Sequence, residues 1–154
     1  MSHTVEAASK VTSLEIAELA ARRLNWDRPF IGQSVLYDGT VTRGIQFRPP
    51  RWLFPVCADM QNGRLQWDNY VPGRYDNSPE WRSGPTAVRW PSDIPTGSAS
   101  RYAGNYEEKG YDEISPFLDA YNAEATIAAA QSEGWIVEEF HNAETGAIEL
   151  TLSR

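Results

Sequence analysis

The sequence predicts an α+β protein, with an antiparallel sheet of about five to seven strands covered on one face by two helices. Apolar residues recur at helical spacing in 12–25 and again in 116–133. Short segments that alternate apolar and polar residues lie between turn signals in 33–70 and after Gly134. Since short turns join consecutive strands, the strands are expected to pair antiparallel.

The C-terminal stretch 115–154 gives the most consistent local signals. Ser115 is a favoured N-cap, and Pro116 suits the first helical position, where its missing N–H costs nothing. Gly134 can take the left-handed conformation that ends a helix. Two alternating strands, 135–140 and 148–153, then follow around a polar turn. The stretch therefore predicts a helix and a hairpin.

An amphipathic helix is predicted near the N-terminus. Thr12-Ser13-Leu14-Glu15 matches a capping box, and the helical pattern continues to about Asn25. Arg22 and Arg23 lie in its last turn, where cations complement the helix dipole. A strand within 3–11 is also expected, before this helix.

Four segments between the two helices predict an antiparallel meander. Asp38-Gly39 is a two-residue hairpin signal, and Gln61-Asn62-Gly63 marks a second turn. Pro55 predicts that its segment is an edge strand or contains a bulge, because proline cannot donate to a strand ladder. The segments are 33–37, 40–47, 52–60 and 64–70.

The segment 71–115 differs in composition and is expected to be an ordered excursion. It holds half of the chain's 10 prolines and many aromatic residues, so it resembles neither a regular element nor a free linker. Arginines lie beside aromatic residues, and Trp and Arg are residue types enriched at protein hot spots. Trp81 and Trp90 are expected to be partly exposed anchors, although burial within the chain is the alternative. The predicted partner-binding residues are Trp81, Arg82, Arg89, Trp90, Arg101 and Tyr102.

Length and composition exclude several classes of protein. With 154 residues and 41% hydrophobic residues, the chain is expected to be a single domain, 1–154. Its net charge of −7 argues against nucleic-acid binding, which needs clustered Lys and Arg. It has no apolar run long enough to span a membrane and no apolar signal-peptide segment. Because Cys57 is the only cysteine, a reducing, cytoplasmic location is expected.

The sequence lacks a recognisable catalytic or metal-binding pattern. His3, His141 and Cys57 do not have the spacing of metal ligands, so no metal and no cofactor are expected. A chelator should therefore leave the melting temperature unchanged. Cys57 has apolar neighbours and is expected to be a core residue. Glu138 and Glu139 are adjacent on a predicted strand, so they point to opposite faces. The protein is accordingly expected not to be an enzyme.

The two ends of the chain resemble an uncharacterised family. Met1-Ser2-His3, Glu133-Gly134-Trp135-Ile136-Val137-Glu138-Glu139 and the segment from Thr145 to Arg154 are similar to the hypothetical chloroplast reading frame thirty-five family. This domain of unknown function occurs in cyanobacteria, red-algal plastids and some of their viruses. The family brings no established activity. Some relatives are encoded near AAA-type ATPases, so the resemblance implies a protein partner.

The leading hypothesis is a non-enzymatic adaptor that acts through a protein partner, either an AAA-type ATPase or a host protein. The runner-up is an acidic inhibitor that mimics nucleic acid, for example a viral one directed against a host nuclease. An enzyme acting on a small or carbohydrate substrate is the third hypothesis. Truncating Leu19 or Ile148 to Ala is expected to cost about 2–5 kcal/mol. The predicted core residues are Leu19, Leu24, Ile45, Phe47, Tyr121, Val137 and Ile148.

Overall fold

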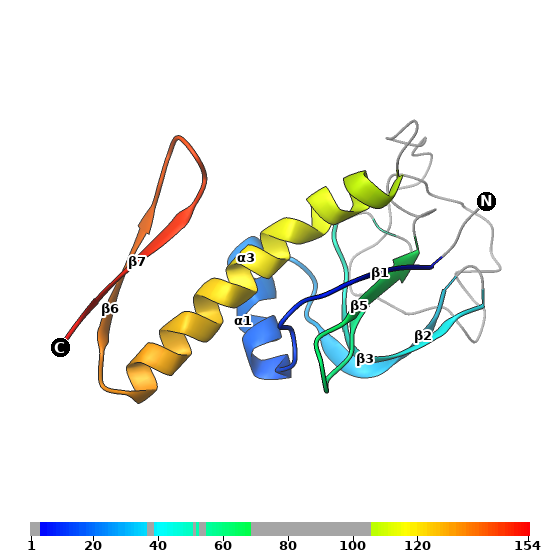
Figure 1. Cartoon of the computed structure of the whole chain (residues 1–154), viewed down its shortest axis with the longest axis horizontal. Coiled ribbons are helices and arrows are strands. Elements are labelled where there is room, and N and C mark those ends of the chain that lie inside the picture. Colours follow the sequence, from blue (N-terminus) through cyan, green and yellow to red (C-terminus); the bar gives the residue numbers. More distant parts are fainter. Residues whose placement is uncertain (1–3, 37–38, 51, 53–54, 69–105) are drawn as a thin grey trace.

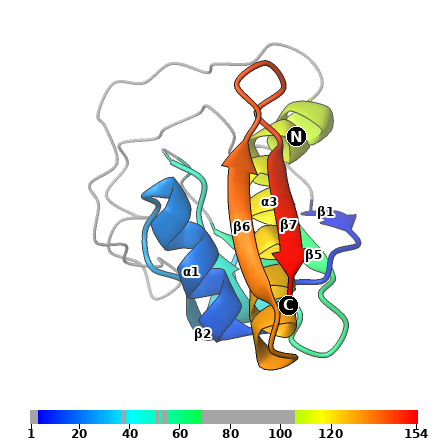
Figure 2. The ribbon, with the colours of Figure 1, turned by 90° about the vertical axis from the view of Figure 1, so that its left-hand side faces the viewer.

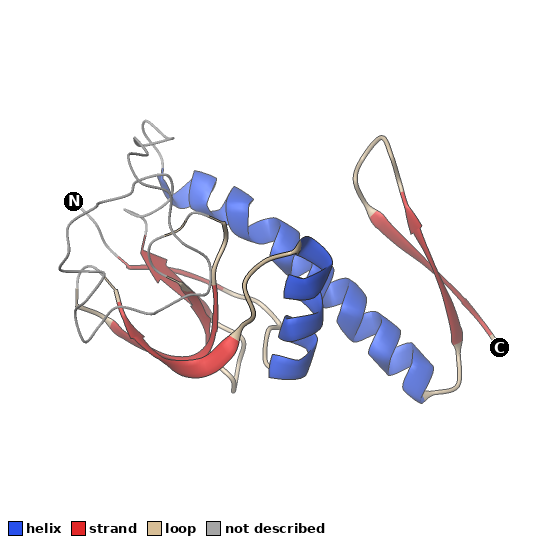
Figure 3. Cartoon of the chain, turned by 180° about the vertical axis from the view of Figure 1, so that it is seen from behind, coloured by secondary structure: helices blue, strands red, loops and turns tan. Residues whose placement is uncertain are grey.

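The computed structural model describes residues 4–36, 39–50, 52, 55–68 and 106–154, and it confirms the α+β class (Figure 1). A five-stranded sheet, two helices and a separate two-stranded hairpin form successive layers (Figure 3). The elements in chain order are β1 (Thr4–Ala7), α1 (Leu14–Leu24), β2 (Phe30–Val35), β3 (Val41–Phe47), β4 (Val56–Ala58), β5 (Leu65–Asp68), α3 (Tyr106–Ser132), β6 (Ile136–His141) and β7 (Ile148–Ser153).

The larger sheet has the strand order β1-β5-β4-β3-β2, and all neighbouring strands are antiparallel. Strands β2 to β5 therefore form the predicted meander. The expectation of an edge strand at Pro55 is wrong, because β4 is the central strand of the sheet. Pro55 lies just before the first residue of β4, so its missing N–H removes no hydrogen bond from the ladder.

The turns of the meander lie where glycines take positive φ angles. Gly39, with φ of +88°, follows Tyr37 and Asp38, which lie outside the described residues. Gly63 has a φ of +74°, and a Cβ atom there would lie 2.4 Å from the Ser9 carbonyl oxygen. The Ser9 hydroxyl in turn donates to the Gly63 carbonyl at 2.5 Å. The second turn thus packs directly against the segment that leads into α1.

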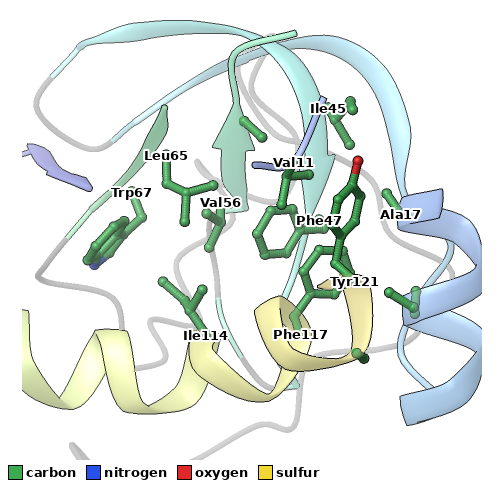
Figure 4. Packing of buried hydrophobic residues seen from close by; sticks show 14 of the residues in the cluster. Val11, Ala17, Ile45, Phe47, Val56, Leu65, Trp67, Ile114, Phe117 and Tyr121 are labelled. Atoms are coloured by element: carbon green, nitrogen blue, oxygen red, sulfur yellow. The ribbon is translucent and has the colours of Figure 1, made fainter. Parts of the chain in front are cut away.

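The core lies between one face of the larger sheet and the two helices (Figure 4). Phe117 of α3 is its centre, with ring centroids 4.0 Å from Phe47 and 5.7 Å from Trp26. Stacked aromatic pairs add to the stabilisation that comes from area burial alone. The sheet contributes Ile45, Phe47, Val56, Ala58, Leu65 and Trp67, and the helices contribute Ala17, Ala20, Ala21, Ile114, Phe117, Ala120 and Tyr121.

Helix α1 begins one residue later than the capping box predicted. Ser13, not Thr12, is the N-cap, and its hydroxyl accepts a hydrogen bond from the Ile16 N–H. The N–H groups of Thr12 and Ser13 both donate to the Tyr121 hydroxyl, at 3.2 and 3.0 Å. The start of α1 is therefore fixed by a side chain of α3. Asn25 ends the helix in the left-handed conformation.

Helix α3 begins at Tyr106, so the prediction that Ser115-Pro116 opens it is wrong. Pro116 lies inside the helix and cannot donate to the Asp112 carbonyl, four residues earlier. The Ser115 hydroxyl donates to that same carbonyl at 3.3 Å, which compensates for the lost bond. The predicted end at Gly134 is confirmed. Gly134 has a φ of +84°, and the next residue, Trp135, donates its N–H to the Ala130 carbonyl at 3.0 Å.

The hairpin β6–β7 lies on the side of α3 that faces away from the larger sheet, and it forms a sheet of its own (Figure 1). This position corrects the predicted core. Ile45, Phe47 and Tyr121 are buried as predicted. Four other predicted core residues are only half-buried, namely Leu19, Leu24, Val137 and Ile148. The two in the hairpin lie on the face toward α3, and they are half-buried because the hairpin does not pack closely against that helix.

Candidate protein-interaction surface

The hairpin is closed by a polar turn that its own residues hold in place. The side-chain oxygen of Asn142 accepts the N–H groups of Glu144 and Thr145, at 2.9 and 3.1 Å. Gly146 has a φ of +72°, and the Asn142 N–H donates to the Ala147 carbonyl at 2.9 Å. These are local interactions, so the residues of the turn fix its conformation.

The two faces of the hairpin differ in their surroundings. Its inner face, toward the helices, carries Val137, Ile148 and Leu150, which are half-buried, and Leu152, which is 43% exposed. The outer face carries Ile136 and Phe140, which are 62% and 53% exposed. Its other members are polar or acidic, namely Glu138, Glu149, Thr151 and Ser153. The outer face thus presents two large apolar side chains beside carboxylates.

Two hollows remain between the hairpin and α3. One, of about 690 Å³, lies beneath the hairpin turn, between Gly146 and Ile148 on one side and Pro116 and Asp119 on the other. The other, of about 780 Å³, lies between Trp135, Leu152 and the small residues of the last turns of α3. The inner face of the hairpin is therefore incompletely packed, even though most of its side chains are apolar.

Arg23 is the main polar link between the hairpin and the helices. Its guanidinium pairs with Glu124 of α3 at 2.8 Å and with Glu139 of β6. The hydrogen bond from Arg23 holds the pKa of Glu139 below its usual value, and Glu139 in turn raises the pKa of Arg23. His141 lies 3.2 Å from Glu139. At the other end of the hairpin, the Arg154 guanidinium lies 4.2 Å from the centre of the Trp135 ring.

The negative charge of the protein is concentrated in the C-terminal helix and hairpin. Residues 111–154 contain nine acidic residues and one basic residue, Arg154, which gives a net charge of −8. The whole chain has a net charge of −7, so residues 1–110 have a net charge of +1. This segregation could have been read from the sequence. The acidic residues are Asp112, Glu113, Asp119, Glu124, Glu133, Glu138, Glu139, Glu144 and Glu149.

We refer to the outer face of β6–β7, the two hollows and the exposed acidic residues of 111–154 as the acidic helix–hairpin surface. In Figure 2 the hairpin lies in front of α3, and α1 lies on the side of β6. The predicted site residues Trp81, Arg82, Arg89, Trp90, Arg101 and Tyr102 all lie outside the described residues. The alternation of apolar and polar residues in 135–140 and 148–153 predicted the hairpin as structure and did not indicate a binding surface.

A second group of polar side chains lies on the face of the larger sheet opposite the helices. The Ser34 hydroxyl lies 2.7 Å from that of Thr42 and donates to the side-chain oxygen of Gln46 at 3.0 Å. The Gln46 amide lies 3.1 Å from the Cys57 sulfur. These side chains are buried and hydrogen-bond one another, so the group orders the sheet. The signal in the sequence is the alternation of Thr42 and Gln46 with the core residues of β3.

Cys57 is buried, as predicted, and burial raises the pKa of its thiol. A buried thiol of raised pKa is a poor nucleophile. Within the described ranges, no three His, Cys, Asp or Glu side chains lie close enough together to hold a metal ion. None of the helices in this part of the chain is long and apolar enough to cross a bilayer.

Comparison of the chain with protein-family models, with curated proteins and with solved structures finds no match. The resemblance of its ends to the chloroplast reading frame thirty-five family therefore stays a prediction.

Proposed function

We propose that the protein is a non-enzymatic binding protein whose acidic helix–hairpin surface docks onto a basic surface of a protein partner. The observation that carries this proposal is that exposed apolar side chains and a net charge of −8 occur together in 111–154. Apolar anchors within a charged rim are typical of protein interfaces. The charge favours a basic partner, because complementary potentials speed association and disfavour other partners.

The size of the apolar side chains supports a protein as the partner. Ile136 and Phe140 are four residues apart in β6, so their side chains lie on the same face of the strand and form a pair of anchors. Full burial of side chains of this size contributes about 1.5–3 kcal/mol each. Interaction with a small ion or a purely polar ligand would leave both anchors in water.

The nucleic-acid mimic is the second candidate. The concentration of nine acidic residues in 111–154 favours it, since a mimic needs closely spaced negative charges. Its partner would be a protein with a basic nucleic-acid-binding groove, such as a nuclease. The adaptor hypothesis places the binding energy in Ile136 and Phe140, whereas the mimic hypothesis places it in the carboxylates.

The resemblance to the chloroplast reading frame thirty-five family suggests where to look for the partner. It favours a cytoplasmic protein of a cyanobacterium or its virus, with an AAA-type ATPase or another host protein as the partner. Capture from a cyanobacterial lysate, read by mass spectrometry, is the corresponding experiment. The partner is expected to be basic over its contact surface, and its capture is expected to weaken at high salt.

A matched pair of variants tests the location of the surface. Ile136→Ser and Ile31→Ser each remove an exposed isoleucine, from β6 and from β2 respectively. We expect Ile136→Ser to weaken capture about tenfold or more, as for a hot-spot residue, and Ile31→Ser to leave it unchanged. Equal effects of the two variants on capture would contradict the proposal. Loss of capture on replacing Glu138 and Glu149 with Gln, with Ile136→Ser neutral, would favour the mimic.

The alternative location of the partner-binding site is the excursion 71–115, where the sequence predicted Trp81 and Trp90 as anchors. Trp81→Ala and Trp90→Ala, made singly, test it by the same capture. Lost capture with a stability change under about 1 kcal/mol would place these residues at the interface, as expected for anchors.

A further inference from the structure

Strand β7 has an open edge on the side of the hairpin away from α1. Arg23 of α1 pairs with Glu139, which places α1 on the side of β6 (Figure 2). Among the described residues, β7 pairs with β6 and with no other strand. An open edge carries unpaired N–H and C=O groups, which are a template for another strand.

The register of the hairpin identifies the groups on this edge. The Asn142 N–H donates to the Ala147 carbonyl, so the main chain of Ala147 is directed toward β6. Main-chain groups alternate in direction along a strand. Those of Ile148, Leu150 and Leu152 are therefore directed to the open edge. The side chains of the same three residues lie on the inner face, beside the hollows.

The sequence of β7 does not protect its edge. Natural edge strands are commonly guarded by Lys, Pro, a bulge or several charges. Strand β7 contains no proline and no lysine, and its one charged residue is Glu149. By contrast, the neighbouring strand β6 carries two adjacent carboxylates, Glu138 and Glu139. An edge of this kind in a folded protein is suited to binding an extended segment.

Charge decides the nature of that segment. A second copy would bring two regions of net charge −8 together, and like charges on adjacent strands are destabilising. A basic strand would instead place cations near Glu149 on the outer face. Its alternate, apolar side chains would extend the inner face formed by Ile148, Leu150 and Leu152.

We propose that β7 binds an extended, basic segment of the partner protein as a third strand, with Lys or Arg alternating with aliphatic residues. This proposal rests on the proposed function and specifies how the partner is recognised. The added strand would supply the main-chain hydrogen bonds, and its aliphatic side chains would cover the open part of the hairpin's inner face.

The test uses the full chain and an acetylated peptide of alternating Lys and Val that is long enough to span β7. A peptide of the same composition, with its lysines and valines in two blocks, is the control. Amide hydrogen exchange is measured by NMR with and without each peptide. We expect the alternating peptide to slow exchange at Ile148, Leu150 and Leu152 about fivefold or more, as for one new strand hydrogen bond each. The block peptide should have a smaller effect.

Two variants separate the contribution of the main chain of β7 to peptide binding from the contribution of its side chain. Leu152→Pro removes an N–H from the open edge, whereas Leu152→Ala removes only the side chain. We expect the alternating peptide to bind Leu152→Pro about fivefold more weakly than Leu152→Ala. Equal affinities would overturn the strand-addition mode. Exchange at the β6 amides of the free variants checks that the hairpin stays formed.

The remaining outcomes distinguish the two proposals. If both peptides bind equally and the edge amides of β7 are unaffected, strand addition is wrong but a basic partner stays supported. If neither peptide binds and Ile136→Ser has no effect on capture, both proposals fail. Slowed exchange at β2 in place of β7 would overturn the choice of edge. Slowed exchange at β7 that rises with protein concentration, without peptide, would show that a second copy occupies it.

Discussion

The larger sheet and the hairpin β6–β7 are both antiparallel and both lie against α3, yet they are packed very differently. Two helices cover one face of the larger sheet, where Phe47, Leu65 and Trp67 are fully buried. The hairpin has similar alternating strands, but hollows remain between it and α3, and its large apolar side chains stay partly exposed. Alternation alone thus specifies a strand, and the elements that cover it decide whether it becomes core or surface.

The two regions also differ in charge. The chain up to residue 110 is nearly neutral, and the last helix and hairpin carry the whole net negative charge. A region that combines carboxylates with exposed apolar side chains is poorly suited to be core and well suited to be an interface. The comparison therefore assigns the stable core to the larger sheet with its two helices, and it supports the proposal that the hairpin is an interface.

The largest effect is expected from a matched pair of phenylalanines. Phe117→Ala removes the ring at the centre of the core and should destabilise the protein by about 3–5 kcal/mol. Phe140→Ala removes an exposed ring from β6 and should change stability by under about 0.5 kcal/mol. Urea unfolding of both variants measures the difference. Similar midpoints would show that the hairpin is part of the core.

A pair of isoleucines sharpens the comparison. Ile45→Ala in β3 should cost about 2–5 kcal/mol, because the side chain is fully buried. Ile148→Ala in β7 should cost about 1 kcal/mol, because that side chain is half-buried beside a hollow. The structure thus lowers the cost that the sequence predicted for Ile148. Thermal unfolding of the two variants gives the comparison, and a larger cost at Ile148 would refute it.

Two turn glycines provide a smaller contrast. Gly63→Ala combines a positive φ with a Cβ atom 2.4 Å from the Ser9 carbonyl oxygen, so a loss of about 2 kcal/mol or more is expected. Gly146→Ala has a positive φ but open space around the new methyl group, so about 1 kcal/mol is expected. Denaturant midpoints of the two variants at equal m-values decide between them. Equal losses would mean that the contact with Ser9 can relax.

The smallest effect is expected at the ion pair of Arg23 and Glu139. Because Arg23 lowers the pKa of Glu139 in the folded state, the pair stabilises the fold above the unfolded pKa of glutamate, about 4.3. That stabilisation is lost as the pH falls through the lower, folded pKa. Since the pair stays partly exposed to solvent, which screens it, Glu139→Gln should cost under about 1 kcal/mol at neutral pH.

Unfolding free energies of the wild type and Glu139→Gln between pH 7 and pH 3 test this sign. The difference between them should shrink toward acid pH. Glu138→Gln is the control, since Glu138 points to the opposite face from Arg23. A difference that grows toward acid pH would contradict the assignment of the pair.

Local signals in the sequence were sufficient to predict those helix ends and turns that are determined by neighbouring residues. Gly134 ends α3 as predicted, and the turn after β6 forms where its polar residues predicted it. Pro116 led to a wrong prediction of the helix start, because proline favours the first helical turn. The hydrogen bond by which the Ser115 hydroxyl compensates for the missing N–H is visible only in the structure. The hairpin forms a sheet of its own beyond α3, and neither that separation nor the start of α3 at Tyr106 has a local signal in the sequence.

The proposed binding surface was less predictable than the fold. The acidic bias of 111–154 was readable from the sequence, but the exposure of Ile136 and Phe140 was not, because it depends on what covers each face. The residues predicted to bind a partner lie outside the described ranges, so their role stays a prediction.

Native-state hydrogen exchange of the free chain tests most directly whether the hairpin is held less firmly than the core. We expect the amides of β3 and β4 to exchange only through global unfolding, with rates that rise steeply with denaturant. Those of β6 and β7 should exchange through local opening, at a free energy several kcal/mol lower and with little dependence on denaturant. If the amides of β6 and β7 instead share the free energy and denaturant dependence of β3 and β4, the hairpin is part of the core unit and the division proposed here is wrong.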